Sequence, residues 1–167
     1  MTKHPLTLSM FAVCALCACS KSEGHDTSDS GAAVASPSFG NGQLAVQFAI
    51  DEDIAEVMEA PISGTFLGEI YDAADVSAIG PADGAEPIAS ISVEVSVAPD
   101  GTATETLYTS PVLAPEEVTV LGALDMDQSG GATSGEPVTI PNRTTFDVPT
   151  DATTAVIVEF TMRYPGR

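Results

Sequence analysis

Apolar and polar residues alternate along most of the chain from residue 43 onward. A period of two is typical of a β-strand that buries one face and exposes the other. Runs with this period predict strands at 44–50, 62–70, 91–97, 102–109, 118–124, 143–148 and 154–164. The Pro, Asp and Gly residues at 99–101 predict a tight turn, after which 102–109 pairs with 91–97 as a hairpin.

Seven short strands separated by clusters of Gly, Pro and Asp predict an all-β fold, an antiparallel β-sandwich of the immunoglobulin-like kind. The last strand is expected to keep its apolar residues on one face as far as Met162 and Tyr164. Only residues 51–60 have the spacing of a helix, whose apolar face would be formed by Ile54, Val57 and Met58. We interpret this segment as a connector, and the alternative is an acidic helix presented to a partner.

The N-terminus has the composition of a secretory signal peptide at residues 1–18. Lys3 and His4 precede an apolar run at 6–18, which ends in small residues. This run is shorter than the roughly 20 apolar residues that a membrane-spanning helix needs. We therefore expect the chain to be exported.

The last residues of this run, Leu-Cys-Ala-Cys at 16–19, resemble the lipobox of bacterial lipoproteins. The resemblance implies that Cys19 becomes the first residue of the mature protein and carries acyl chains such as palmitate, which form a stable membrane anchor. Ser20 resembles the outer-membrane signal of Gram-negative lipoproteins. Residues 19–42 are rich in Ser, Gly and Asp, so they predict a flexible tether after the lipid. Cleavage without lipid is the alternative.

Charge limits the partners of the exported chain. It contains 24 Asp and Glu residues against five Lys and Arg, a net charge of −19. Such a surface repels phosphate backbones and anionic headgroups, so we expect no nucleic-acid partner and membrane attachment through the lipid alone. Divalent cations and basic proteins are its natural complements. The alternative is that the acidity only keeps a tethered domain soluble.

The predicted folded domain, residues 43–167, lacks the residue types of several catalytic sites. The three cysteines and both histidines precede it, at Cys14, Cys17, Cys19, His4 and His25. The domain therefore has no disulfide, no thiolate zinc site and no Ser–His or Cys–His nucleophile pair. We expect a non-catalytic protein. The alternative is a small hydrolase that uses paired carboxylates.

The segment 113–127 combines a Pro-containing turn, a strand of alternating apolar residues and an Asp-rich loop. It resembles the penultimate hairpin of transthyretin-like and carboxypeptidase-regulatory-like sandwiches, and 64–68 is compatible with their early strand. The chain departs from these families at 116–118, where Glu-Glu-Val stands in place of the usual Gly-x-Tyr. The resemblance implies a sandwich that serves as a scaffold or binding domain, without an activity of its own.

The loop 125–136 has oxygen-bearing residues at the spacing of an EF-hand calcium loop. Its ligand positions would be Asp125, Asp127, Ser129, Gly131, Thr133 and Glu136. Gly130 permits the sharp bend, and hard oxygen ligands favour calcium over zinc or copper. The loop departs from an EF-hand because a strand precedes it, Pro137 follows it, and Ala132 replaces a branched apolar residue. We therefore weigh a calcium site against a plain acidic connection between strands.

Together these features predict a non-catalytic lipoprotein of the cell envelope, held at the outer membrane by Cys19. Its sandwich domain would bind or scaffold another envelope or extracellular protein, with calcium at the acidic loop as a candidate cofactor. A related hypothesis makes calcium the regulator of that interaction.

Overall fold

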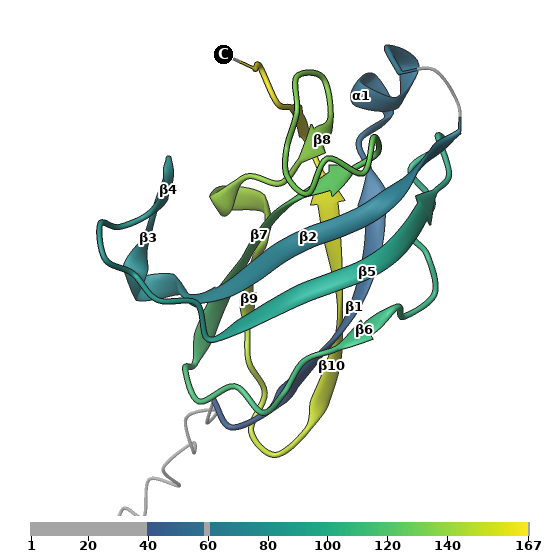
Figure 1. Cartoon of the computed structure of the whole chain (residues 1–167). Coiled ribbons are helices and arrows are strands. Elements are labelled where there is room, and N and C mark those ends of the chain that lie inside the picture. The colour runs from purple at the N-terminus through teal and green to yellow at the C-terminus, as the bar shows by residue number, and fades with distance from the viewer. Residues whose placement is uncertain (1–39, 59–60, 167) are drawn as a thin grey trace, which may run out of the picture. The chain divides into compact units, whose positions relative to one another are not determined.

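Strands dominate the computed structural model, which describes residues 40–58 and 61–166 (Figure 1). The strands are β1 (Gln43–Ile50), β2 (Ile62–Asp72), β3 (Val76–Ser77), β4 (Gly80–Pro81), β5 (Ala89–Val97), β6 (Tyr108–Thr109), β7 (Glu117–Asp125), β8 (Pro137–Val138), β9 (Thr145–Asp147), β10 (Thr153–Phe160) and β11 (Met162–Arg163). The described helices are α1 (Glu52–Glu56) and two 3-10 turns, η1 (Ala73–Asp75) and η2 (Pro141–Arg143). None of them has the length and apolarity needed to cross a membrane.

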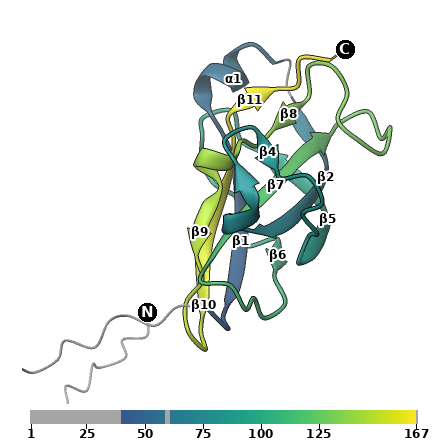
Figure 2. The ribbon, with the colours of Figure 1, turned by 90° about the vertical axis from the view of Figure 1, so that its left-hand side faces the viewer.

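The strands form two main sheets. The larger has the order β11-β8-β7-β2-β5, with β9 also paired to β7, and the smaller has the order β10-β1-β6. In Figure 2, β2 and β5 lie on the side of the fold opposite β10. The predicted all-β sandwich is therefore confirmed. The signal peptide, Cys19 and the tether up to residue 39 lie outside the described residues.

The alternating apolar positions of both sheets meet in one core. At its centre lie the rings of Phe48, Phe66 and Phe160, which belong to β1, β2 and β10 and are fully buried. Their ring centroids are 4.8 to 6.1 Å apart, in tilted, edge-on and stacked pairs that favour aromatic contact. The period of two therefore identified the buried face of each of these strands correctly.

The first and last long strands of the sandwich run in the same direction. β1 and β10 pair in parallel along their whole length, from Gln43 opposite Thr153 to Ile50 opposite Phe160. The other strand pairs are antiparallel. Alternation is the same in either direction, and a parallel pair needs a long connection, which here is most of the domain.

The predicted hairpin between 91–97 and 102–109 is wrong. β5 pairs instead with β2 through nine residues, and the chain after the turn crosses to the smaller sheet. There the Thr104 amide donates to the carbonyl of Phe48 at 2.8 Å, and the Leu107 amide donates to that of Val46 at 3.0 Å. The turn signal is local, whereas the choice of partner depends on β2, which offers β5 a longer antiparallel match.

The prediction that 154–164 is one strand is also wrong. β10 ends at Phe160, and β11 joins the larger sheet beside β8. Met162 is consequently 42% exposed, and both Met162 and Tyr164 lie outside the core. The chain changes sheets at Thr161, so the side chains after it no longer share a face with those of β10.

Of the helix predicted at 51–60, the described residues 51–58 form only the single turn α1. Asp51 caps it, because its Oδ1 accepts a hydrogen bond from the Asp53 amide at 3.0 Å. Ala55 is buried, whereas Val57 is 62% exposed. The predicted apolar face is therefore only partly correct, because α1 ends before Val57 could turn inward.

Candidate metal centre

The acidic loop joins β7 to β8, two neighbours of the larger sheet (Figure 1). The ladder pairs Ala123 with Val138, and the same register continued by two residues places Asp125 opposite Glu136. Both acidic side chains are buried, with exposed fractions of 3% and 5%. Antiparallel pairing therefore brings the two ends of the predicted calcium loop together.

Three carboxylates converge at this end of the sheet. One carboxylate oxygen from each of Asp125, Asp127 and Glu136 lies within 4.8 Å of the other two. Like charges this close repel each other, and more strongly where burial removes water from between them. A bound cation would offset that repulsion. The structure therefore brings together the first, third and last of the six predicted ligands.

Asp125 is held by the backbone of the loop that it begins. Its Oδ1 accepts a hydrogen bond from the Ser129 amide at 3.0 Å, and its Oδ2 accepts one from the Gly130 amide at 2.8 Å. Gly130 has a φ of +86°, in the left-handed region that favours glycine. The predicted role of Gly130, to allow a sharp bend, matches this backbone conformation.

Glu136 closes the loop from the other side. Its Oε1 accepts hydrogen bonds from the amides of Met126 at 2.6 Å and Asp127 at 3.3 Å. Its Oε2 accepts one from the Thr133 amide at 2.7 Å. These bonds tie the start of β8 to the residues that leave β7, and they satisfy a buried carboxylate that would otherwise be costly.

Asp127 is the exposed member of the cluster. A hydrogen bond from Ser129 is the main effect that holds the pKa of Asp127 below its usual value of 3.8; desolvation opposes it, and the hydrogen bond from Thr133 adds a smaller lowering effect. The Thr133 hydroxyl donates to its Oδ2 at 3.1 Å. Asp127 is therefore ionised at neutral pH and can supply a charged oxygen ligand.

The other three predicted ligands have different positions. Ser129 and Thr133 contact the carboxylates as hydrogen-bond donors, through the bonds given above. The Ser129 hydroxyl also donates to the carbonyl of Gly131 at 3.0 Å, so that carbonyl already has a partner inside the loop. In this conformation the three carboxylates are the groups that could hold a metal ion, and Ser129 and Thr133 position them through hydrogen bonds.

The carboxylates keep acceptor capacity for a cation. An ionised carboxylate offers about four acceptor sites. Asp125 and Asp127 each accept two of the hydrogen bonds described above, and Glu136 accepts three. A hard cation such as calcium could therefore use the remaining lone pairs without displacing the amides.

The sequence did not predict the contact between this loop and the C-terminal segment. The Gly135 amide donates to the carbonyl of Tyr164 at 2.8 Å, and the Tyr164 amide donates back to the carbonyl of Glu136 at 2.7 Å. Arg163 Nε donates to the carbonyl of Gly135 at 2.9 Å. No local signal in the sequence could indicate this contact, because it depends on the change of sheet after β10.

Comparison with protein-family models, with curated proteins and with solved structures gives no match for this chain. The fold and the site therefore define it only as a class, an acidic β-sandwich with a carboxylate cluster at the β7–β8 turn. The lipobox and transthyretin-like resemblances stay predictions.

Proposed function

We propose that this chain is a non-catalytic lipoprotein of the bacterial cell envelope, whose β-sandwich binds a partner protein and is stabilised by calcium. The observation that carries the calcium part is the convergence of Asp125, Asp127 and Glu136 within 4.8 Å. Oxygen ligands of this kind suit calcium, and loosely built sites outside the cell bind it with a Kd of about 10⁻⁴–10⁻³ M.

The hydrogen bonding of the cluster supports a structural role rather than catalysis. Each of the three carboxylates already accepts at least two hydrogen bonds from the loop. These hydrogen bonds fix the position of each carboxylate. Asp125 and Glu136 are consequently suited to holding an ion between two strands.

The envelope part of the proposal is supported by the sequence at 1–42. A signal peptide, a lipobox ending in Cys19 and a polar tether together would hold the sandwich near a membrane surface. The acidic sandwich gains nothing from anionic headgroups. Its position at the membrane would depend on the acyl chains alone.

The calcium site is tested by thermal unfolding of the mature protein in detergent, in EDTA and in about 10 mM CaCl2 or MgCl2, roughly ten times the weakest Kd expected. We expect calcium to raise the Tm more than magnesium, because magnesium gives up its water less readily. Asp125→Asn should abolish the calcium shift. Asp151→Asn, which removes an exposed acid in a distant turn, should leave it intact. An equal calcium response in all three proteins would show that the loop is only a connection.

The lipid anchor is tested by mass spectrometry of the mature N-terminus together with membrane fractionation. We expect acyl chains on Cys19 and co-sedimentation with outer-membrane vesicles. Cys19→Ala should lose both, whereas Cys17→Ala should keep both. An unmodified N-terminus on a freely soluble wild-type protein would reduce the proposal to an exported sandwich without an anchor.

A further inference from the structure

β5 is the terminal strand of the larger sheet. It pairs with β2 from Ala89 to Val97, and no described strand pairs with its other side. Figure 1 shows β5 at the margin of the sheet, next to β2. An edge of this kind presents a row of backbone donors and acceptors on which another strand can pair.

This edge lacks three of the usual protections against strand pairing. Long edge strands are commonly protected by Pro, Lys, a bulge or a covering segment. β5 contains neither Pro nor Lys, and its register with β2 is unbroken for nine residues. Its one charged residue is Glu94, which accepts a hydrogen bond from the Thr65 hydroxyl at 2.6 Å and so leans toward β2, away from the free edge.

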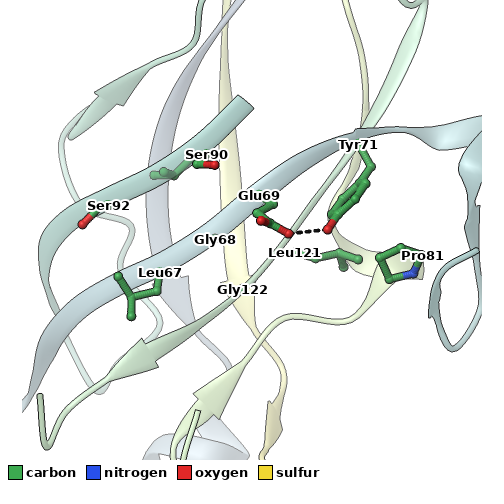
Figure 3. Close-up of a pocket in the computed structure, with 10 residues that line it drawn as sticks. Leu67, Gly68, Glu69, Tyr71, Pro81, Ser90, Ser92, Leu121 and Gly122 are labelled. Carbon is green, nitrogen blue, oxygen red and sulfur yellow. Dashed lines mark hydrogen bonds between the residues drawn. The ribbon is translucent and has the colours of Figure 1, made fainter. Parts of the chain in front are cut away.

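A hollow of about 550 Å³ lies on the outer face of the sheet beside this edge (Figure 3). Small, apolar and aromatic side chains surround its one acidic group, and its main residues are Ser90, Ser92, Leu67, Leu121, Tyr71 and Glu69. The Tyr71 hydroxyl donates a hydrogen bond to Glu69, which fixes the carboxylate. The hollow therefore combines apolar walls with one oriented negative charge, a common composition for a specificity pocket.

The hollow is within reach of a strand added to β5. Glu69 stands directly across from Ser90 in the β2–β5 ladder. Strands are about 4.8 Å apart, so a residue added beside Ser90 would have its backbone about 10 Å from that of Glu69. The apolar stem of an Arg or Lys side chain can cover this distance, since it crosses only the small Ser90 and keeps its charged head at the carboxylate.

The electrostatics along the edge formed by β5 favour a basic partner. The Lys and Arg residues in the described ranges are Arg143 in η2 and Arg163 in β11, and β11 is at the opposite end of the strand order from β5. Past the C-terminal end of β5, at the other end of the strand from Ser90, a second hollow of about 410 Å³ is lined by acids that include Asp51, Asp100 and Glu159. Such a field attracts a basic segment and repels an acidic one, a second copy of this chain included.

We infer that the free edge of β5 is a docking site for an extended segment of a basic partner protein, which adds a strand to the larger sheet and places an Arg or Lys side chain in the Glu69 hollow. Backbone pairing would supply affinity, and the hollow would select the side chain. This inference rests on the proposed binding role, but it requires neither calcium nor the lipid.

The test uses fluorescent ten-residue peptides that alternate Val with Arg, or Val with Glu, added to the mature protein in detergent. We expect saturable binding of the Arg peptide alone, in EDTA as well as in calcium, with new hydrogen-exchange protection confined to 89–97. Ser92→Lys should weaken this binding on the order of tenfold, because it places a like charge at the edge. Thr153→Lys adds the same charge at an exposed position of β10 and should weaken it less.

Glu69→Gln tests the hollow separately from the edge. It keeps the size of the side chain, so it should weaken the Arg peptide while leaving the hydrogen-exchange pattern of the free protein unchanged. Equal binding by wild-type protein, Ser92→Lys and Glu69→Gln, or protection that appears away from 89–97, would overturn the inference. An envelope protein crosslinked equally to wild-type protein and Ser92→Lys would also overturn it, and would leave the proposed binding role intact.

Discussion

At the scale of single residues, the packing of β2 against β7 depends on two glycines that face each other. Gly68 and Gly122 are cross-strand partners, and the Phe66 ring covers both. A Cβ on Gly122 would lie 2.5 Å from the carbonyl oxygen of Leu67 and 2.6 Å from that ring. We expect Gly122→Ala to lower the free energy of unfolding by about 1–3 kcal/mol, the usual cost of overpacking.

This cost is measured as the shift in the midpoint of urea unfolding at an unchanged slope. Gly131→Ala is the matched control, because a Cβ there meets no atom within 4 Å. Equal midpoints for the two variants would mean that both Phe66 and the backbone of β2 can shift to make room, and that packing does not require the glycine pair.

Tyr71 provides a residue-scale prediction on pH. Its hydrogen bond to Glu69, burial and the negative charge of Glu69 together raise the pKa of Tyr71 above 10.0. A raised folded-state pKa contributes stability that is fully present below the unfolded pKa and is lost as pH rises through the folded one. We therefore expect the stability difference between wild type and Tyr71→Phe to shrink as the pH rises above about 10.

The tyrosine absorbance titration checks the assignment. Tyr71→Phe should remove a phenol that titrates late, and Glu69→Gln should move that late step toward lower pH. If the titration step that disappears in Tyr71→Phe has an ordinary pKa, then Glu69 does not raise the pKa of Tyr71. Burial raises the pKa of Tyr108 as well, so one late step should survive in both variants.

At the scale of elements, the chain changes sheets after β10 at a residue whose side-chain hydroxyl is buried. Among the described residues, the buried Thr161 hydroxyl has no hydrogen-bond partner. The hydroxyl of Thr144, also buried, donates to the carbonyl of Ile140 at 3.1 Å. An unpaired buried hydroxyl costs free energy, and a paired one contributes about 1 kcal/mol.

We therefore expect Thr161→Val to preserve or raise the free energy of unfolding, and Thr144→Val to lower it by about 1 kcal/mol. Chemical denaturation of the two variants measures this difference directly. Equal losses in both would show that Thr161 has a partner in solution, such as an ordered water.

The contact between the C-terminal segment and the acidic loop gives a second element-scale prediction. Tyr164→Pro removes the amide that donates to Glu136, so about 1 kcal/mol of stability should be lost. Calcium should also bind more weakly, because the ion must then order a looser loop. Calorimetric titration with calcium measures the affinity of Tyr164→Pro, and Arg163→Gln, which removes only an exposed hydrogen bond, is the control. An unchanged calcium affinity in Tyr164→Pro would show that the contact with the C-terminal segment does not contribute to calcium binding.

Prediction from the sequence succeeded where the signal is local. The alternation at 91–97 predicted both the strand and its buried face, and the spacing of Asp125, Asp127 and Glu136 predicted three groups that converge. It failed where the outcome depends on a distant partner. The turn at 99–101 is real, but β2 is the better neighbour for β5, and the contact of Tyr164 with the acidic loop follows from a change of sheet that alternation does not encode.

At the scale of the whole molecule, the same reasoning explains the parallel closure of the sandwich. β1 and β10 pair although more than 100 residues separate Gln43 from Thr153. Their alternation is compatible with several neighbours and with both directions. Their pairing becomes favourable only when Phe48 and Phe160 meet the ring of Phe66 from the other sheet, so the choice belongs to the assembled core.

The excess of acidic residues also acts on the whole molecule. A net charge of −19 in 167 residues makes the compact state repel itself, and the unfolded chain relieves that repulsion by expanding. In EDTA, raising NaCl from about 0.01 M to 0.15 M shortens the screening length from about 30 Å to about 8 Å. We expect the Tm to rise over this range, and KCl to act equally, because screening depends on ionic strength rather than on the identity of the monovalent cation.

Calcium added at fixed ionic strength should then produce a further rise in Tm that Asp125→Asn lacks. A Tm that does not change with salt would mean that the acidic residues are too far apart to oppose folding. The carboxylates at the β7–β8 turn would then be the main place where charge affects stability.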